Sequence, residues 1–309
     1  MATNMKAGHE MDDANANGSG TRTWGGHSMW GTLERVLVFP PVAPDASVDW
    51  QAFGYLRPID HARAVQEHAA FRDLLTAAGV QVIIGETDSA TIPDAIFPYD
   101  SVYMSDAGAI ITRLGKDLRL PENALLAATM GELAVPIVGT ITAPGTLDGG
   151  DCLWLDEQTL VIGRGYRTNV EGIRQMESFL RPQGVTVLSV DLPHYHGRGE
   201  CLHLLSMISM LDRDLAVVHL PLMAVALVEL LEERGITLVE IPDAEFETQG
   251  TNVLALGPRR CLLLRENVGT AERLRAAGCE VTLYTGDEIS HNRTGGPTCL
   301  TRPILRAAH

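Results

Sequence analysis

The sequence predicts an α/β protein built from five repeated units, each a strand, a helix and two further strands, arranged around one axis. Short apolar runs rich in β-branched residues recur along the chain, as is typical of buried strands. A helix-like stretch and two more strands follow each run. After a longer first interval, the units repeat at roughly 45–55 residues, a spacing typical of radial or stacked repeats. Sequence identity between units is negligible, so a doubly wound open sheet remains the alternative.

The first strand of each unit is an apolar run that ends in a polar or glycine-containing turn. These runs are "RVLVFPP" from Arg35, "GAIITRLG" from Gly108, "TLVIGRG" from Thr159, "DLAVVHLP" from Asp214 and "RCLLLREN" from Arg260. The expected helices are 61–78, 121–130, 169–180, 222–234 and 270–277. Glycine often marks the helix end, at Gly79, Gly184, Gly235 and Gly278.

A third strand is expected to close each unit. Its five examples are "DSVYMSD", "GGDCLWLD", "LLSMISML", "TNVLALG" and "TCLTRPIL". The chain begins on the first strand of a unit, and the final strand would complete the circle. Five units around an axis would place each helix on the outside.

The chain is expected to contain a disordered tail over residues 1–24 and one catalytic domain over 25–309. The start, "MATNMKAGHEMDDANANGSG", lacks the apolar run of a signal peptide. The most apolar segment, 215–231, is interrupted by His219, Pro221 and Glu229, which favours a strand and a buried helix over a membrane span.

Charge and cysteine content narrow the range of partners. The net charge is −15 and the isoelectric point is about 5.0, which argues against nucleic acid or a membrane as a partner. The five cysteines form no CxxC pair, which indicates neither a zinc site nor a disulfide framework and favours the cytoplasm. We expect no metal and no cofactor.

Polar residues occupy equivalent positions beside the third strands. Asp100 and Asp106 flank this strand in the first unit, whereas the other units carry Asp148, His203, Thr251 with Asn252, and Cys299 just before it. In a five-fold ring these positions converge on one axial cavity. The sequence therefore predicts a thiol, an imidazole and several carboxylates facing one another.

Each of these residues also has a structural interpretation. A lone cysteine in a turn is more often inert, and His203 could be a core histidine. The glycine-rich turn "TGGPTC" and the alignment of Cys299 with His203 favour catalysis. Asp151 is expected to hold the "TLDGGD" turn. The run "HYHGRGECLH" lacks an acidic ligand set at fixed spacing and does not indicate a metal site.

A thiolate near a histidine is an activated nucleophile. Carboxylates in the same cavity suit a cationic substrate, and a guanidinium presents paired N–H donors that carboxylates bind in bidentate fashion. We therefore expect a small cationic guanidino compound, attacked by Cys299 at its central carbon, with His203 as acid and base.

The same motifs resemble the pentein, or amidinotransferase, superfamily, whose fold is a five-bladed α/β propeller. They are most similar to the dimethylarginine dimethylaminohydrolase branch, with arginine deiminases as relatives. The resemblance extends from about Gly26 to the end of the chain. It rests on "GGHSMWGTLERVLVFPP", "DSVYMSDAGAIITRLG", "TLDGGDCLWL", "GRGYRTNVEG", "HLLSMISML" and "GGPTCLTRPI", in that order.

The resemblance implies a role for each matching residue. Cys299 would be the nucleophile, His203 the acid and base, and Asp148 the carboxylate that partners both the histidine and the guanidinium. Asp106 would bind the guanidinium group, and Asp100 would lie near the α-amine of the substrate. Arg113 and Arg167 would hold the α-carboxylate. A homodimer is compatible with the resemblance and rests on it alone.

The sequence departs from its relatives at two positions. Many members carry glutamate directly before the position of Asp106, where this chain has Ser105, which leaves the N-substituent open among dimethyl, monomethyl, hydroxy and none. Arginine deiminases carry aspartate two residues after the histidine, where this chain has Leu205. The expected reaction is hydrolysis of an N-substituted L-arginine to citrulline and an amine through a covalent thiouronium. An arginine deiminase-type hydrolase, an amidinotransferase and a non-catalytic binding protein are the alternatives.

Overall fold

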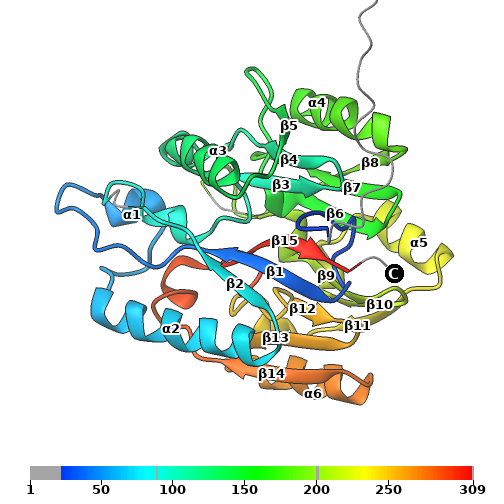
Figure 1. The fold of residues 1–309 in the computed structure, drawn as a ribbon. Coiled ribbons are helices and arrows are strands. Elements are labelled where there is room, and N and C mark those ends of the chain that lie inside the picture. The colour runs from blue at the N-terminus through cyan, green and yellow to red at the C-terminus, as the bar shows by residue number, and fades with distance from the viewer. Residues whose placement is uncertain (1–21, 88–89, 200–201, 308–309) are drawn as a thin grey trace, which may run out of the picture.

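Five three-stranded sheets make up the fold (Figure 1). The computed structural model describes residues 22–87, 90–199 and 202–307, so most of the expected disordered tail lies outside the described residues. The sheets, with neighbouring strands in order, are β15–β1–β2, β3–β4–β5, β6–β7–β8, β9–β10–β11 and β12–β13–β14. The structure therefore has the expected α/β character.

The sheets share one design, in which the middle strand pairs antiparallel with one neighbour and parallel with the other. The middle strands are β1 (Leu33–Val38), β4 (Gly108–Ile111), β7 (Thr159–Arg164), β10 (Leu215–Val218) and β13 (Arg260–Leu264). Their antiparallel neighbours are β15 (Arg302–Arg306), β3 (Val102–Ser105), β6 (Cys152–Asp156), β9 (Ile208–Asp212) and β12 (Leu254–Gly257). Their parallel neighbours are β2 (Gln81–Ile84), β5 (Ile137–Thr140), β8 (Thr186–Asp191), β11 (Thr237–Glu240) and β14 (Glu280–Tyr284).

A helix makes each parallel crossover, as parallel pairing requires. These helices are α2 (His61–Ala77), α3 (Pro121–Glu132), α4 (Val170–Leu180), α5 (Val225–Glu233) and α6 (Val268–Ala276), close to the predicted ranges. Helix α5 begins three residues later than predicted because Leu220–Leu222, with Pro221, forms a separate 3₁₀ turn. A short helix, α1 (Trp50–Phe53), lies in the connection after β1.

The third strand of each predicted unit pairs outside that unit, which corrects the predicted unit boundaries. Strand β3 pairs with β4 of the next unit, with Val102 opposite Ile111 and Ser105 opposite Gly108. Only two residues, 106 and 107, join these strands, and so short a connection forces adjacent antiparallel pairing. The expectation that the final strand returns to the first is confirmed, because β15 pairs with β1.

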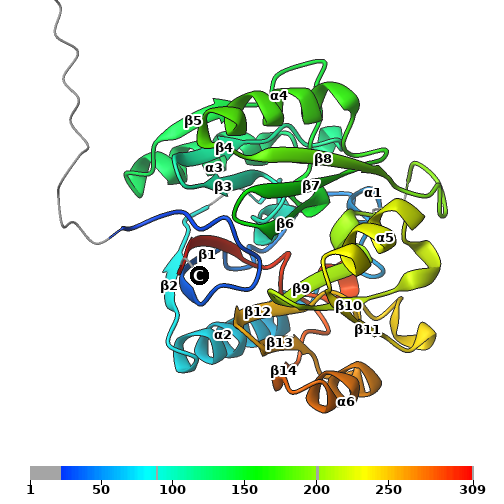
Figure 2. The same cartoon turned by 90° about the vertical axis from the view of Figure 1, so that its right-hand side faces the viewer.

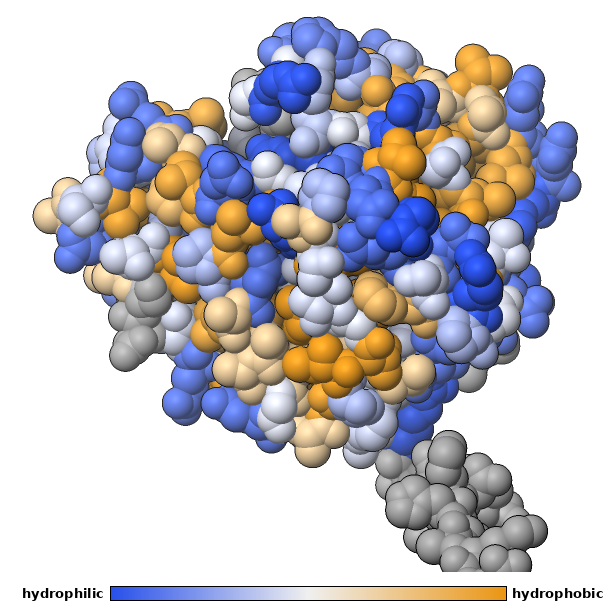
Figure 3. All heavy atoms as spheres, turned by 90° about the horizontal axis from the view of Figure 1, so that it is seen from above, coloured by the Kyte–Doolittle hydropathy of each residue, from blue (hydrophilic) through white to orange (hydrophobic). Residues whose placement is uncertain are grey.

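Burial differs systematically between the strands of a sheet. The antiparallel neighbours β3, β6, β9, β12 and β15 are almost entirely buried, whereas residues of the parallel edge strands, such as Ile84 and Ile137, are exposed. Figure 2 shows the helices on the outside and the buried strands toward the middle. On the face seen in Figure 3, hydrophobic and hydrophilic residues are interspersed. Because the buried strands lie toward the middle of the molecule, the turns that lead into them lie there as well.

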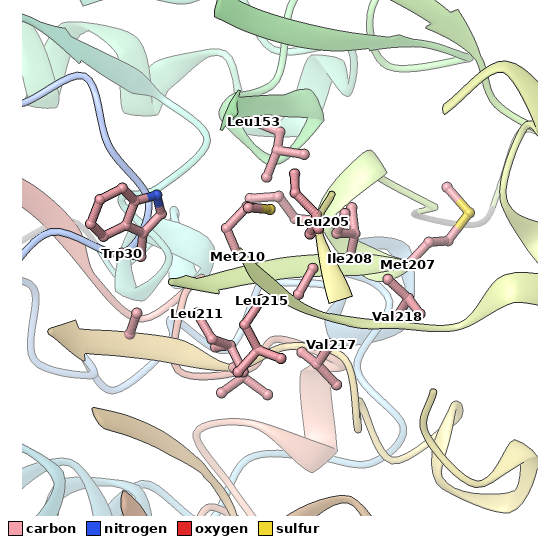
Figure 4. Close-up of a cluster of buried hydrophobic side chains, with 14 of the residues drawn as sticks. Trp30, Leu153, Leu205, Met207, Ile208, Met210, Leu211, Leu215, Val217 and Val218 are labelled. Carbon is pink, nitrogen blue, oxygen red and sulfur yellow. The ribbon is translucent and has the colours of Figure 1, made fainter. Parts of the chain in front are cut away.

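The largest hydrophobic cluster packs between neighbouring sheets. It joins Leu153 of β6 with Met210 of β9 and Val217 of β10, and Trp30 from the segment before β1 closes one side (Figure 4). Burial of these apolar side chains is the main stabilising contribution and holds the sheets in fixed relation. No helix within the described ranges is long and apolar enough to cross a membrane.

Candidate active site

All five turns that lead into the buried strands contribute residues to the lining of one cavity. The lining includes Asp100 before β3, His203 before β9, Thr251 and Asn252 before β12, and Cys299 before β15. The fifth turn supplies Gly150 to the lining, and the neighbouring Asp148 contacts His203. The structure thus brings together Cys299, His203, Asp148 and Asp100, as the sequence predicted.

Cys299 lies in the turn of residues 297–300, directly after Gly295 and Gly296, and is partly exposed to the cavity. Asn252 holds this turn from the neighbouring sheet: its Oδ1 accepts from the Thr298 backbone N–H at 3.0 Å, and its Nδ2 donates to the Cys299 Sγ at 3.2 Å. A Cβ on Gly296 would approach the Asn252 side chain to 2.4 Å, so glycine is required here. The glycine-rich sequence therefore serves to let Asn252 reach the thiol.

His203 and Asp148 form a buried pair. The Nε2 atom of His203 lies 3.0 Å from Oδ2 of Asp148, and the other carboxylate oxygen accepts from the Gly115 backbone N–H at 2.8 Å. The His203 backbone N–H donates to the Ser206 Oγ at 3.1 Å. These bonds fix the orientation of the imidazole ring from three segments of the chain.

Gly150 brings the backbone close to the imidazole ring. A Cβ at this position would lie 2.4 Å from Nδ1 of His203 and 3.0 Å from Oδ1 of Asp100. The Gly150 backbone N–H donates to Oδ1 of Asp100 at 2.9 Å. Any side chain at residue 150 would displace the histidine or the aspartate.

Asp100 is buried and remains ionised. Its Oδ2 accepts from Arg119 at 2.7 Å, and its Oδ1 lies 3.9 Å from Nδ1 of His203. Burial raises the pKa of Asp100, but His203, Arg119 and the bond from Gly150 outweigh it and lower the pKa to about 2. A permanent carboxylate therefore borders the cavity.

Asp100 belongs to a buried cluster of charged side chains, of which Arg119 and Arg293 also line the cavity. Arg119 donates to both carboxylate oxygens of Glu122, at 2.7 and 2.8 Å, and lies 3.6 Å from Asp94. Asp94 in turn accepts two bonds from Arg293, at 3.0 and 2.7 Å. Burial raises the pKa of Glu122 to about 7, even though Arg119 opposes the shift. The two arginines compensate several carboxylates that have little contact with water.

Asp151 holds the histidine segment as well as its own turn. Its carboxylate accepts from the Leu204 backbone N–H at 3.0 Å and from the Thr168 Oγ1 at 2.6 Å. Burial raises the pKa of Asp151 to about 7, while the charge of His203 and the bond from Thr168 lower it in part. The sequence predicted a role in the turn but not the link to Leu204.

Asp106 does not join this group, which corrects the prediction that it faces the cavity. It follows β3 whereas Asp100 precedes it, so the two aspartates lie beyond opposite ends of the strand. The Asp106 side chain is 45% exposed, pairs with Arg22 and accepts from the Gly26 backbone N–H at 2.8 Å. Ser105 is turned away as well, since its Oγ donates to the Gly108 carbonyl at 2.9 Å. Tyr99, which directly precedes Asp100 in the sequence, also lines the cavity.

Arg113 and Arg167 lie near the site but are not among the residues lining the cavity. Arg113 is half-buried and bridges Leu147 through its backbone; Arg167 is buried, with its backbone against Gly115. Both arginines therefore flank the segment that binds Asp148. Lys116 is next to Gly115, and its Nζ donates to the Phe53 carbonyl of α1 at 2.8 Å.

Four further residues that line the cavity were not predicted from the sequence. Tyr195, Phe246, Glu247 and Gln249 line it, and the hydroxyl of Tyr195 donates to the Glu247 carboxylate. The rings of Tyr195 and Phe246 meet edge to face at 6.0 Å. These residues come from loops with no recognisable motif, so only their position in space reveals them.

Asp100, Asp148 and His203 each offer an atom within 4.8 Å of the others, a spacing that could hold a metal ion. Each is already engaged: Asp100 with Arg119, Asp148 with Gly115, and His203 with Asp148. The contacts of these three side chains are those of an oriented imidazole–carboxylate pair beside an ionised aspartate.

Comparison with known proteins agrees with this geometry. The model of a family described as N,N dimethylarginine dimethylhydrolase, eukaryotic, matches residues 51–306. The chain is 32% identical over 244 residues to an N(G),N(G)-dimethylarginine dimethylaminohydrolase of Streptomyces coelicolor, covering 79% of this chain and 86% of that protein. It is 30% identical over 255 residues to the protein of the same name from Pseudomonas aeruginosa, covering 82% and 93%.

Solved structures show the same fold. A dimethylarginine dimethylaminohydrolase adduct with 4-chloro-2-hydroxymethylpyridine has a TM-score of 0.71 and 25% identity, covering 89% of this chain and all of that one. An amidinotransferase from Microseira wollei has a TM-score of 0.74 at 16% identity, covering 93% and 98%, and shows similarity of fold alone.

Fold and comparisons together place the protein in the pentein, or amidinotransferase, superfamily, which confirms the resemblance seen in the sequence. Within it, the chain belongs to the dimethylarginine dimethylhydrolase family. It is a hydrolase that acts on C–N bonds of linear amidines.

Proposed function

We propose that this enzyme hydrolyses an N-substituted L-arginine, of the dimethylarginine or monomethylarginine type, to citrulline and an amine. The observation that supports the proposal most directly is that the Cys299 thiol, the Asp148-bound His203 and the ionised Asp100 meet at one cavity. The curated relatives from Streptomyces coelicolor and Pseudomonas aeruginosa carry the name of this activity.

Asp100 and Asp148 bind the guanidinium group of the substrate in this scheme. Each carboxylate oxygen can accept about two hydrogen bonds, so Asp100 has acceptor capacity left beyond its bonds to Arg119 and Gly150. The positive charge on the substrate makes its central carbon electrophilic. Arg113 and Arg167, which flank Gly115, bind the α-carboxylate, since two guanidinium groups suit a carboxylate.

Cys299, as the thiolate, then attacks the guanidinium carbon and forms an S–C bond. The Asn252 amide, which donates to Sγ at 3.2 Å, stabilises the thiolate. His203 delivers a proton to the substituted nitrogen, the C–N bond breaks, and the amine departs. The product of this step is a covalent thiouronium on Cys299.

In the second half, neutral His203 removes a proton from water, and the resulting hydroxide adds to the thiouronium carbon. The S–C bond then breaks, which releases citrulline and regenerates the thiolate. Asp148 orients the imidazole ring and stabilises its protonated form in both halves. One water is consumed for each amine released.

The arrangement of the five sheets is also part of this proposal. We infer that the five sheets are blades of a closed ring, supported by the pairing of β15 with β1. The single catalytic domain over 25–309, the homodimer and the cytoplasmic location stay predictions.

A product assay tests this function. Wild type and Cys299→Ser are given L-arginine and its Nω-methyl and Nω,Nω-dimethyl derivatives, and both citrulline and the released amine are measured. We expect equimolar citrulline and amine from wild type, and loss of both, together with loss of covalent trapping by mass spectrometry, in Cys299→Ser. Cys279→Ser, at a buried thiol outside the cavity lining, is the matched control and should keep its activity.

Full turnover by Cys299→Ser would overturn the covalent mechanism. A new guanidino compound formed with an added amine, without citrulline, would show a transferase instead. Ammonia from unsubstituted arginine as the preferred reaction would show a deiminase.

A further inference from the structure

A second, smaller cavity lies among the buried strands, and two arginines of β15, Arg302 and Arg306, help to line it. Each of these arginines is only 4% exposed. Among the described residues that line this cavity there is no aspartate and no glutamate. The cavity is therefore bordered by positive charge alone.

Both guanidinium groups donate to backbone carbonyls. Arg302 donates through Nη1 to the carbonyls of Tyr99 and Val102, and Arg306 donates through Nη1 to two other carbonyls at 2.6 and 2.9 Å. In the described part of the chain, no carboxylate oxygen lies within 4.0 Å of either guanidinium group. Arg119, which is buried to the same extent, contacts three carboxylates. Buried charges in proteins are normally paired in the way that Arg119 is.

Aromatic rings compensate only one of the two charges. The Cζ atom of Arg302 lies 4.0 Å from the ring centre of Tyr99 and 5.2 Å from that of Tyr103, which is favourable for a cation. Arg306 packs on no ring in this way within the described ranges. Burial lowers the pKa of Arg306 to about 10, and the charge of Arg302 acts in the same direction while Tyr99 opposes it. Arg306 therefore carries an uncompensated positive charge at neutral pH.

The cavity is small and enclosed. Its volume of about 20 Å³ is enough for one water molecule or one small ion. Gly26 closes one wall, because its φ is +105° and a Cβ there would lie 2.7 Å from the Arg306 carbonyl oxygen. Ser28 also lines the cavity, and its Oγ accepts from the Trp30 and Gly31 N–H groups, which leaves the hydroxyl proton available for an acceptor. Sulfate, phosphate and organic anions need more room.

We propose that this cavity binds one small monovalent anion, such as chloride, which compensates the charges of Arg306 and Arg302. Tyr99 and Thr298 line both this cavity and the active-site cavity, and they directly precede the aspartate and the cysteine of the active site. A bound anion would therefore stabilise the core next to both turns. Binding of the anion needs no turnover, so it is independent of the proposed function.

Bromide can replace chloride and scatters anomalously, so it locates the anion directly. Crystals of the wild-type protein are grown with sodium bromide in place of chloride, and anomalous difference maps are calculated at the bromine absorption edge. We expect a peak inside the cavity, in contact with the Arg306 guanidinium group. A water molecule at this position, or a map without a peak there, would overturn the proposal.

The melting temperature in solution provides the second test. It is measured against chloride concentration, with gluconate keeping the ionic strength constant. A ligand that binds only the folded state raises the melting temperature, so we expect a saturable rise of several degrees in wild type. Arg306→Met should lose this rise. Arg234→Met, at an exposed arginine paired with Asp156 outside the cavity lining, is the matched control and should keep it.

An equal chloride response in wild type and Arg306→Met would overturn the assignment of the anion to this cavity, as would a wild-type melting temperature that does not respond to chloride. If Arg306→Met does not fold, the bromide map and the wild-type titration decide.

Discussion

His203 and Asp148 are 55 residues apart in the sequence, yet His203 Nε2 lies 3.0 Å from Asp148 Oδ2. Both residues sit in turns that lead into buried strands, β9 and β6, of two different sheets. The packing of those sheets therefore sets the length of the hydrogen bond that orients the imidazole ring. The predictions below ask what keeps this pair and its surroundings in place.

Gly150→Ala should disable the site without unfolding the protein. The added methyl would lie 2.4 Å from Nδ1 of His203, so the ring must move. Because small misplacements of catalytic groups are costly, we expect kcat to fall about 100-fold. Gly131→Ala is the control, since nothing lies within 4 Å of its added Cβ. A Gly150→Ala enzyme with normal kcat would contradict the assigned position of His203.

Arg119→Met should strongly destabilise the protein. It leaves the buried carboxylates of Asp100 and Glu122 without their cation. Breaking a buried ion pair from one side costs about 3–5 kcal/mol, measurable as a loss in the free energy of urea unfolding. Arg164→Met, which removes an exposed pair with Asp191, serves for comparison and should change little. Similar effects of the two substitutions would show that Arg119 is not a structural counter-ion.

Stability should decrease as the pH rises from about 4 to about 7. Burial raises the folded-state pKa of Asp151 to about 7, so over this range the folded protein holds a proton that the unfolded chain has released. The unfolding free energy therefore falls as the pH rises, by roughly 2–4 kcal/mol for this group. Glu122, with its pKa raised to about 7, acts in the same direction.

Asp151→Asn should make this pH dependence shallower, because the amide does not titrate. Unfolding by urea between pH 4.5 and 8 measures it, and Asp100 does not interfere since its pKa of about 2 lies below this window. An identical slope in wild type and Asp151→Asn would mean that Asp151 is ionised in the folded protein.

Lys116→Met should loosen the segment that contains α1. The Lys116 Nζ donates to the Phe53 carbonyl at 2.8 Å and lies 5.7 Å from the centre of the Phe53 ring. Without this contact we expect limited proteolysis by chymotrypsin to cut residues 50–57 several-fold faster. Arg174→Met, at an exposed helical position, should leave the cleavage rate unchanged. Equal rates in wild type and Lys116→Met would show that other contacts hold the segment.

Much of the fold was predictable because its signals are local. Apolar runs and helix-ending glycines predicted the α/β order and the helices to within a few residues. The pairing of the third strands was mispredicted, because order along the chain does not say which neighbour a strand joins. The prediction for Asp106 was wrong for a related reason. Asp106 and Asp100 flank the same strand, and the sequence does not say at which end of that strand the cavity lies. The structure places the cavity at the end where Asp100 lies.

The sequence by itself determined the chemical groups of this protein: a cysteine, a histidine and aspartates at repeated positions before buried strands, and with them the family. The tertiary structure alone decided which groups meet and the ionised state of Asp100 beside Arg119. The physical reason is that hydrogen bonding, burial and charge compensation depend on distances between segments far apart in the chain, whereas strand and helix signals arise within a few neighbouring residues.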